Sequence, residues 1–319
     1  MILNFLMTKA QTFLRRILAE LIWKTRIPSR EQRIVHNAYI HNSGLVFKNF
    51  RLVSASANND KGLFTTIFLF EWKKGERTTK KKSHDTMSFL GLSIWSNYYH
   101  TLIEQTTRLH WLLENTPANL TILTRGDFQG ILGIVADAYS INFTPTFIDG
   151  SEWRWCKAKT FIVPPLQPST IDRHTAPFKQ IRDNTEASEL GRRILIMRRK
   201  RTFKDPVFVE TEAKAKYGLE TFFLEDLELF NQIALFKSAE VVVGIHGAGL
   251  TNLLWCNANT RVFEIFALNE RATQQKGLTM YAKLAETLNL DYQPIYGQNS
   301  KHWKDIDIEF PFAAIDKFW

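Results

Sequence analysis

The chain has 319 residues, of which 45% are hydrophobic and 23% are charged. This balance argues against a largely disordered chain, and the length suffices for two domains of about 150 residues each. The formal net charge of +9 favours an anionic partner, and nucleotide, anionic glycan, acidic membrane and nucleic acid all satisfy that condition. Cys156 and Cys256 stand far apart without the spacing of a zinc site, which argues against a disulfide scaffold and suits a reducing compartment.

The N-terminal segment, residues 1–30, is predicted to form a basic amphipathic helix, because apolar residues recur in it at roughly helical spacing among arginines and lysines. Such a helix either makes peripheral contact with an anionic membrane through residues 1–26 or packs on the protein's own surface. No run reaches the ~18–20 apolar residues that a transmembrane helix requires, and no cleavage site follows a signal core.

Residues 31–175 are predicted to form a first α/β domain of short strands and amphipathic helices. Ser96 or Asn97 caps its longest helix, and Pro117 follows the end of that helix. The charged loop at 73–82 is expected to be solvated. The predicted strands lie at residues 44–47, 50–53, 63–70, 120–123, 143–148 and 159–163, and the predicted helices at 97–115 and 130–139.

A polar, proline-containing linker at 164–185 leads into a second α/β domain, residues 176–319. Strands and helices alternate regularly there, which indicates a mainly parallel sheet with ligands bound outside the carboxyl ends of its strands. The predicted strands lie at residues 193–197, 219–223, 240–245, 261–265 and 291–296, and the predicted helices at 207–217, 227–236 and 277–288.

The most informative segment of the chain is a glycine turn between a strand and a helix. Gly244, Gly247 and Gly249 surround His246, between an apolar β-branched run and leucines at helical spacing. Glycines allow a ligand to approach the backbone, and the unpaired N–H groups of a first helical turn attract anions. The turn therefore predicts a phosphate site, with a structural histidine in a tight strand–helix turn as the alternative.

Three blocks of this sequence resemble the motifs of glycosyltransferase family 61. In chain order they are the block Asn97–His100 with Glu104 and Arg108 after it, then Ile194–Arg199, and then Gly244–Asn252. The motifs of the family occur in the same order. The family includes bacterial capsular-polysaccharide transferases, plant xylan-modifying transferases and animal O-linked N-acetylglucosamine transferases. Three blocks in order are far more specific than a lone glycine motif.

The resemblance implies the GT-B architecture, in which two Rossmann-like domains with mainly parallel sheets face a cleft. Residues 31–175 would form the acceptor side and residues 176–319 the nucleotide-sugar side. The implied activity is inverting transfer from a nucleotide-diphosphate sugar, with UDP favoured, to a hydroxyl of a glycan or lipid-linked acceptor in capsule or other surface polysaccharide synthesis. Animal and plant members usually carry a luminal membrane anchor that is not seen here, so a bacterial cytoplasmic enzyme is expected.

His100, Glu104 and Arg108 are spaced by four residues and therefore share one face of the predicted helix. His100 lies in the first turn, where the helix dipole disfavours the imidazolium and leaves a ring that can accept a proton. His100 and Glu104 are thus the candidate catalytic bases, while Asn97 and Arg108 are expected to bind the acceptor or support the site. Without the resemblance, an exposed ion pair with a capping histidine explains the same spacing.

The candidate donor site combines the glycine turn with residues at two predicted strand ends. Arg198 resembles the family arginine that contacts the donor nucleotide. An arginine suits that role because its guanidinium pairs with phosphate oxygens in a bidentate manner. Glu264 either accepts hydrogen bonds from a ribose diol, as the family implies, or is a surface glutamate or a salt-bridge partner. Asn252 either touches the phosphate or bonds the local backbone. The complete set of expected donor-binding residues is Arg198, Arg201, His246, Gly247, Ala248, Gly249, Asn252 and Glu264.

No metal site and no cofactor besides the nucleotide sugar are expected. The pair Asp305 and Asp307 alternates with isoleucines near the C-terminus, a pattern typical of an exposed edge and not of a metal-binding loop. Arginines and a helix terminus can balance the diphosphate charge instead.

Two other functions are compatible with parts of the sequence. A non-catalytic scaffold protein of a polysaccharide assembly complex would explain the N-terminal helix and the weakly kept arginine motif after residue 199. A nucleic-acid-binding protein would explain the positive charge, but no recognisable module supports it, and nucleic acid is not an expected partner.

Overall fold

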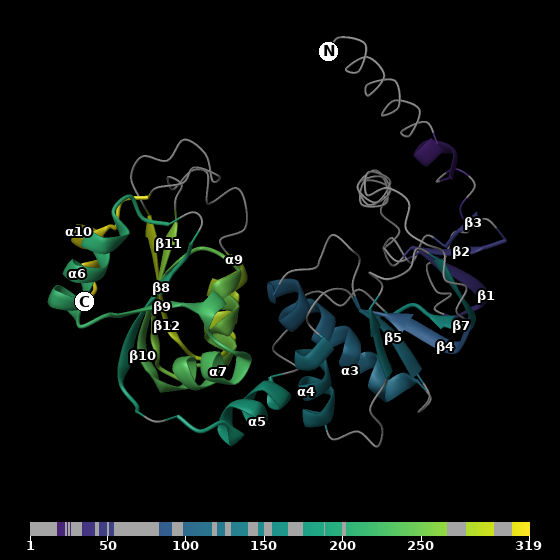
Figure 1. Ribbon diagram of the computed structural model, residues 1–319, viewed down its shortest axis with the longest axis horizontal. Helices are drawn as coiled ribbons and strands as arrows, with labels where there is room; N and C mark the ends of the chain where they lie inside the picture. Colours follow the sequence, from purple (N-terminus) through teal and green to yellow (C-terminus); the bar gives the residue numbers. More distant parts are fainter. Residues whose placement is uncertain are drawn as a thin grey trace, which may run out of the picture. The chain divides into compact units, whose positions relative to one another are not determined.

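The chain divides into two compact units, residues 1–170 (unit 1) and residues 171–319 (unit 2). A computed structural model describes residues 18–22, 24, 26, 34–41, 45–49, 51–53, 83–90, 98–116, 120–124, 129–139, 146–149, 155–164, 175–187, 189–199, 202–266, 279–296 and 308–319. Figure 1 shows the helices and strands of each unit in chain order.

Unit 1 contains a seven-stranded sheet in the order β3-β2-β1-β7-β4-β5-β6. The strands from β7 through β4 and β5 to β6 pair in parallel, whereas β1, β2 and β3 pair antiparallel and extend one edge. The strands are β1 (Ile34–His41), β2 (Val46–Lys48), β3 (Arg51–Leu52), β4 (Ser83–Phe89), β5 (Leu120–Thr124), β6 (Thr146–Asp149) and β7 (Trp155–Ile162).

Two strands of unit 1 were not predicted from the sequence. Strand β1 has a polar interior with Asn37 at a positive φ of 54°, and β4 carries polar residues in place of an apolar run. Strand β4 is nevertheless central, and its Ser88 is fully buried because the hydroxyl donates to the Ile162 carbonyl at 2.7 Å. The predicted strand at 63–70 lies outside the described residues.

The long helix predicted at 97–115 is present, but it begins with a π-helical segment. This segment is η3 (His100–Gln105), it continues directly into α3 (Thr106–Asn115), and α4 (Gln129–Ala138) follows β5. π-Helical insertions are rare and occur frequently at functional sites.

The predicted N-terminal helix is only partly described. Residues 18–22 are helical, and Ala19 and Ile22 pack against the core of unit 1 while Leu21 is 55% exposed. This turn therefore packs on the protein itself, and residues 1–17 lie outside the description. None of the helices in the described ranges combines the length and apolar character needed to cross a bilayer.

Unit 2 contains a five-stranded, fully parallel sheet in the order β12-β11-β10-β8-β9. Figure 1 shows α6 and α10 on one face of this sheet and α7 and α9 on the other. The strands are β8 (Arg192–Met197), β9 (Glu220–Phe223), β10 (Ala239–Ile245), β11 (Arg261–Phe266) and β12 (Asp291–Tyr296). The helices are α5 (Ala176–Asn184), α6 (Pro206–Tyr217), η6 (Leu224–Asp226), α7 (Leu229–Ser238), η7 (Ala248–Trp255), α9 (Thr279–Thr287) and α10 (Phe312–Ile315).

Helix α6 shows how local sequence sets the bounds of these elements. The Asp205 carboxylate caps its start by accepting from the Phe208 N–H at 3.0 Å, and Pro206 occupies the first turn, where no N–H is needed. Gly218 ends the helix at φ 68°, a left-handed conformation that glycine adopts easily.

Helix α5 lies within the segment predicted as a linker. Pro177 sits in its first turn, and the buried Phe178 and Ile181 dock the helix on unit 2, with Phe178 packed edge-on against Trp255. The division between the units at 170/171 falls within the predicted connection, but its second part is a packed helix.

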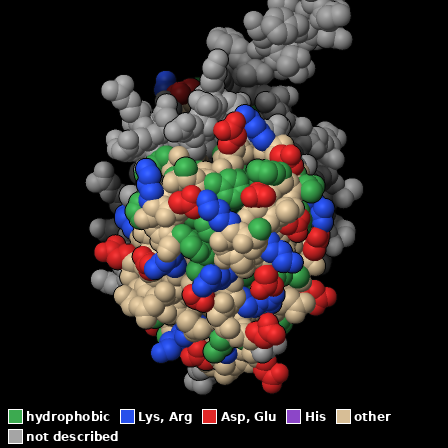
Figure 2. Space-filling model, turned by 90° about the vertical axis from the view of Figure 1, so that its left-hand side faces the viewer, with side chains coloured by type: hydrophobic (Ala, Val, Ile, Leu, Met, Phe, Trp, Pro, Cys, Tyr) green, Lys and Arg blue, Asp and Glu red, His purple; other side chains and the backbone are tan. Residues whose placement is uncertain are grey.

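The face of unit 2 that carries α6 and α10 mixes acidic and basic side chains with small apolar areas (Figure 2). Two of its ion pairs join α6 or the segment before it to the C-terminal segment, namely Lys216–Asp316 and Lys204–Glu309. The positive net charge is therefore not gathered into a single-sign surface on this face, which gives nucleic acid no extended basic track there.

Candidate functional site

Both units reverse the order of their strands at one point of the sheet. In unit 2, β9 lies on one side of β8 and β10 on the other, so the reversal falls between β8 and β10. In unit 1, β5 and β7 flank β4 in the same way. Ligands of open α/β sheets bind in the crevice outside the carboxyl ends of the strands at such a point. The predicted site residues follow these strand ends.

The glycine turn lies at the carboxyl end of β10. The last five residues of the strand are buried, whereas residues 246–249 are partly exposed, so the chain emerges from the core at His246. The predicted helix after the turn is a 3₁₀-helix, η7, whose first turn closes when the Leu250 N–H donates to the Gly247 carbonyl at 3.0 Å. The N–H groups of Ala248 and Gly249 precede this bond and have no acceptor within the helix, which makes them candidate anion donors.

Arg198 follows β8 and reaches the same turn. Its Nη1 donates to the His246 carbonyl at 3.1 Å, and a Cβ added to Gly247 would lie 2.5 Å from that nitrogen. A side chain at position 247 would displace the flexible guanidinium from the turn, so glycine is favoured there. The structure brings Arg198, His246 and the 247–249 backbone together, as a phosphate site needs.

The His246 ring is held from three sides. Its Nδ1 lies 2.5 Å from Glu264 Oε1, the Phe266 ring stacks on it with centroids 5.2 Å apart, and Tyr281 packs edge-on at 5.7 Å. The Tyr281 hydroxyl also donates to the Gly247 carbonyl at 2.8 Å and so links α9 to the turn. His246 itself remains 41% exposed.

Glu264 lies behind His246 and not at the surface. Its side chain is 1% exposed, and its second oxygen, Oε2, accepts from the Tyr292 hydroxyl at 2.5 Å. Burial, and next the charge of Glu264, raise the pKa of Tyr292, so this hydroxyl remains a donor. Of the alternatives for Glu264, the geometry favours a paired carboxylate over a ribose contact, because its side chain is buried and lies against His246.

Asn252 is also buried and has a supporting position. Its amide nitrogen donates to Gln232 Oε1 at 3.0 Å and to the Gly249 carbonyl at 3.2 Å, and its oxygen accepts from Trp255 Nε1 at 3.0 Å. These bonds fasten η7 to α7. Of the two alternatives for Asn252, the geometry favours local bonding over a phosphate contact.

In unit 1, His100 opens η3 after β4 and forms a close pair with Glu104. His100 Nδ1 lies 2.8 Å from Glu104 Oε2, and the two side chains are 27% and 26% exposed. The Tyr99 ring packs edge-on against the imidazole at 5.5 Å, and burial followed by the Glu104 charge raises the pKa of Tyr99 to about 12. A histidine and carboxylate that both reach the surface can exchange a proton with a bound hydroxyl.

Arg108 is set apart from this pair by its burial. It is 4% exposed, and its Nη1 donates to the Leu90 carbonyl at 2.6 Å just after β4. Burial lowers its pKa to about 10, which still leaves the guanidinium charged at neutral pH. Of the two predicted roles, binding an acceptor or supporting the site, this geometry favours support.

Several expectations fall outside the described residues. These are Asn97, Arg201 and the aspartates at 305 and 307. Within the described ranges, no three histidine, cysteine, aspartate or glutamate side chains gather as metal ligands. Phe266, Tyr281 and Tyr292 were not predicted as site residues. The alternation of β12 could have indicated Tyr292, because it shares a sheet face with Pro294, the register partner of Glu264.

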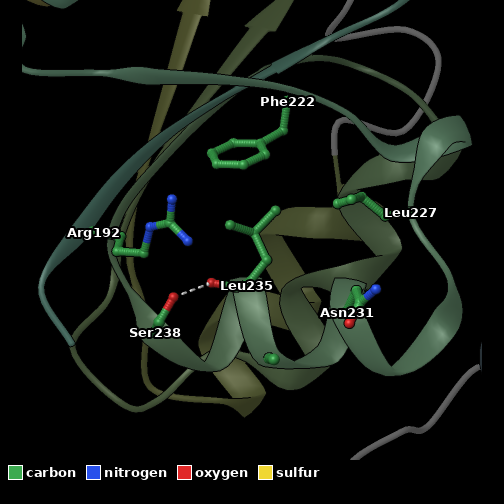
Figure 3. Close-up of a pocket in the computed structure, with 7 residues that line it drawn as sticks. Arg192, Phe222, Leu227, Asn231, Leu235 and Ser238 are labelled. Carbon is green, nitrogen blue, oxygen red and sulfur yellow. Dashed lines mark hydrogen bonds between the residues drawn. The ribbon is translucent and has the colours of Figure 1, made fainter. Parts of the chain in front are cut away.

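A separate pocket of about 220 Å³ lies between β8, β9 and α7 (Figure 3). Its charged group, Arg192, starts β8, pairs with Glu220 and lies over the Phe222 ring at 5.1 Å. The Ser238 hydroxyl, at its end, donates to the Leu235 carbonyl at 2.7 Å. Because these polar groups lie away from the strand carboxyl ends and bond within the protein, the pocket is distinct from the candidate site.

Comparisons with known proteins show the family of the chain. Residues 98–263, just over half of the chain, match the family Glycosyltransferase 61, and this range includes both histidine–glutamate pairs except the final Glu264. The chain is also 29% identical over 96 residues to the EGF domain-specific O-linked N-acetylglucosamine transferase of Drosophila melanogaster. That match covers 30% of this chain and only 18% of the Drosophila protein.

Proposed function

Because the chain belongs to glycosyltransferase family 61 and is therefore a glycosyltransferase, we propose that it moves a sugar from a nucleoside-diphosphate donor to a glycan hydroxyl. One observation carries the donor assignment. Arg198, His246 and the partly exposed 247–249 backbone converge at the reversal point of the unit 2 sheet. Unit 2 is then the donor-binding unit, and UDP is the favoured nucleotide.

The donor diphosphate is held without a metal ion in this proposal. The Arg198 guanidinium and the N–H groups of Ala248 and Gly249 supply positive charge and hydrogen bonds at one place. Charge-assisted hydrogen bonds of this kind contribute about 1.5–3 kcal/mol each, and they grow stronger as negative charge develops on the leaving diphosphate.

Unit 1 supplies the base. Nδ1 of His100 lies 2.8 Å from Glu104 Oε2, and we assign the acceptor proton to the opposite ring nitrogen, Nε2. The acceptor oxygen attacks the anomeric carbon from the side opposite the diphosphate, and the carbon–oxygen bond to the diphosphate breaks with its electron pair on the phosphate oxygen. The acceptor proton passes to His100, and the sugar configuration is inverted.

A thermal-shift panel tests the donor assignment. The panel contains UDP, ADP, GDP, CDP and UDP-sugars, each with and without EDTA. UDP-N-acetylglucosamine is included because the Drosophila relative is named for N-acetylglucosamine. We expect selective stabilisation by one nucleotide that EDTA does not remove. Stabilisation that disappears with EDTA and returns with Mn²⁺ would contradict the metal-free donor site.

The acceptor and product are proposed from the family alone. Capsule or another surface polysaccharide is the favoured product, with a bacterial cytoplasmic enzyme as its source. Incubation of the protein with its donor and candidate glycans, followed by NMR of the new anomeric proton, tests both acceptor and inversion. A well-folded sample that binds none of the nucleotides, with or without glycan, would support the scaffold alternative.

A further inference from the structure

Two residues lie behind His246 and support its ring through buried contacts, without touching the donor themselves. We propose that Glu264 and Tyr292 are positioning residues, which hold Nδ1 of His246 inward and direct Nε2 toward the donor diphosphate. This inference rests on the proposed function, because it concerns the same donor site. It develops the paired alternative for Glu264 and not the ribose contact.

Burial of the Glu264 carboxylate has a free-energy cost. A side chain that is 1% exposed has lost its hydration, and a buried charge is stable only when hydrogen-bonded and paired. Glu264 receives both kinds of contact, from Tyr292 at Oε2 and from His246 at Oε1. The contact with His246 is therefore one of the two that stabilise the buried carboxylate.

The orientation of the His246 ring is fixed by its neighbours. Phe266 stacks on the imidazole, the Tyr281 edge faces it, and the His246 backbone is fixed by its N–H bond to the Ile265 carbonyl at 2.9 Å and by Arg198. The titratable and charged groups around the ring are thus Glu264, Tyr281 and Arg198, with Tyr292 behind the carboxylate. These contacts leave the ring little freedom to turn Nδ1 away from Glu264.

The fixed orientation of the ring determines which nitrogen a ligand meets. When Nδ1–H donates to a carboxylate, the opposite nitrogen is the one presented to solvent, and the carboxylate stabilises positive charge on the ring. The 41% exposure of His246 and the adjacent Arg198 place that nitrogen at the turn where the diphosphate binds. A ring fixed in this way binds an anion without first having to reorient.

The test separates orientation from charge with two substitutions. Glu264→Gln keeps an oxygen acceptor for Nδ1–H but removes the negative charge, whereas Glu264→Leu removes both. Tyr292→Phe removes only the support to Oε2, and His246→Gln removes the ring. The matched control is Glu220→Gln, which removes a carboxylate paired with Arg192 at the first residue of β9.

The first readout needs no ligand. Long-range ¹⁵N–¹H NMR of histidine-labelled protein reports which ring nitrogen carries the proton, with the His246 signals assigned by their loss in His246→Gln. We expect an Nδ1 proton in the wild type, Glu264→Gln and Glu220→Gln, and its loss from Nδ1 in Glu264→Leu. An unchanged Nδ1 proton in folded Glu264→Leu would overturn the inference.

The second readout is affinity, measured by calorimetry with UDP and with inorganic pyrophosphate, which carries a diphosphate without a base. We expect affinity to fall about tenfold in Glu264→Gln, to the level of His246→Gln in Glu264→Leu, and about threefold in Tyr292→Phe, with no change in Glu220→Gln. Wild-type affinity in folded Glu264→Leu would overturn the inference. Should Glu264→Leu not fold, wild-type affinity in His246→Gln would overturn it, because the ring would then contribute nothing to donor binding. If the wild type binds neither probe while its tautomer depends on Glu264, the donor proposal fails and the orientation by Glu264 stands.

Discussion

Each unit of this protein places a histidine beside a glutamate, and in each unit the histidine follows a strand that borders the reversal of the sheet order. In unit 1, His100 and Glu104 are neighbours on one helix and are exposed to nearly the same degree, 27% and 26%. In unit 2, His246 is 41% exposed, but Glu264 comes from the next strand of the sheet and is 1% exposed.

This difference indicates that burial of the carboxylate, and not the pairing itself, determines the chemical role of a histidine–glutamate pair. An exposed carboxylate beside the ring leaves both groups within reach of a hydroxyl that must lose a proton. A buried carboxylate acts only through the ring, by fixing its orientation and stabilising its charge. The unit 1 pair is therefore suited to catalysis and the unit 2 pair to anion binding, and substitutions in the two pairs should affect different kinetic constants.

The largest effect is expected for His100→Gln. Loss of a general base lowers turnover by about 10²-fold to 10⁴-fold, while the affinity for the nucleotide donor stays unchanged. Steady-state kinetics together with donor calorimetry check both parts. His110→Gln is the matched control, because His110 lies on α3 with Glu114 four residues later at 3.4 Å. Weaker donor binding with unchanged turnover at saturation would contradict the division between the pairs.

A smaller loss of turnover is expected for Glu104→Gln. If Glu104 orients His100, removing its charge lowers kcat by about 10-fold to 100-fold, the range typical of residues that orient a functional ligand. Single-turnover rates at saturating donor measure this step directly, and Glu114→Gln serves as the control. A loss as large as that of His100→Gln would identify Glu104 as the base instead.

In unit 2, Arg198→Ala should weaken donor binding by about tenfold or more, because it removes a charge-assisted contact to the diphosphate. Calorimetry with UDP and pyrophosphate measures the loss. Arg199→Ala provides the neighbouring control, since Arg199 is bonded to Asp226 and lies over the Phe223 ring at 4.9 Å. Equal losses in the two variants would indicate a general charge effect and no specific site.

The smallest effect is expected for Gly247→Ala. The new methyl group would lie 2.5 Å from Arg198 Nη1, so the flexible guanidinium must move away from the turn. We expect donor affinity to fall about threefold to tenfold with little change in melting temperature, because only a side-chain end is displaced. Gly130→Ala is the control, since nothing lies within 4 Å of its added Cβ. Unchanged donor affinity would show that Arg198 does not bind from its observed position.

The sequence alone determined most of unit 2. Its five strands and the helices α6, α7 and α9 were predicted within about two residues, because long apolar runs and regular spacing report burial directly. The glycine turn around His246 and the pairing of His100 with Glu104 could also be predicted, since both depend on residues close together in the chain. Strand β4 could not be predicted, because most of its residues are polar and its place in the sheet depends on pairing with two other strands.

The exposure of the candidate donor-site side chains depends on the tertiary structure. The sequence left open whether Glu264 and Asn252 contact the donor or bond within the protein. Their buried contacts are made with Tyr292 and Gln232, which lie 28 and 20 residues away in the chain. The π-helical start at His100 and the 3₁₀ form of η7 were not predicted either, because the helical spacing of the sequence does not distinguish these forms from an α-helix. Residue type and spacing indicate which chemistry is available, whereas exposure is a property of the packed fold, because it depends on neighbours that come from other strands and helices.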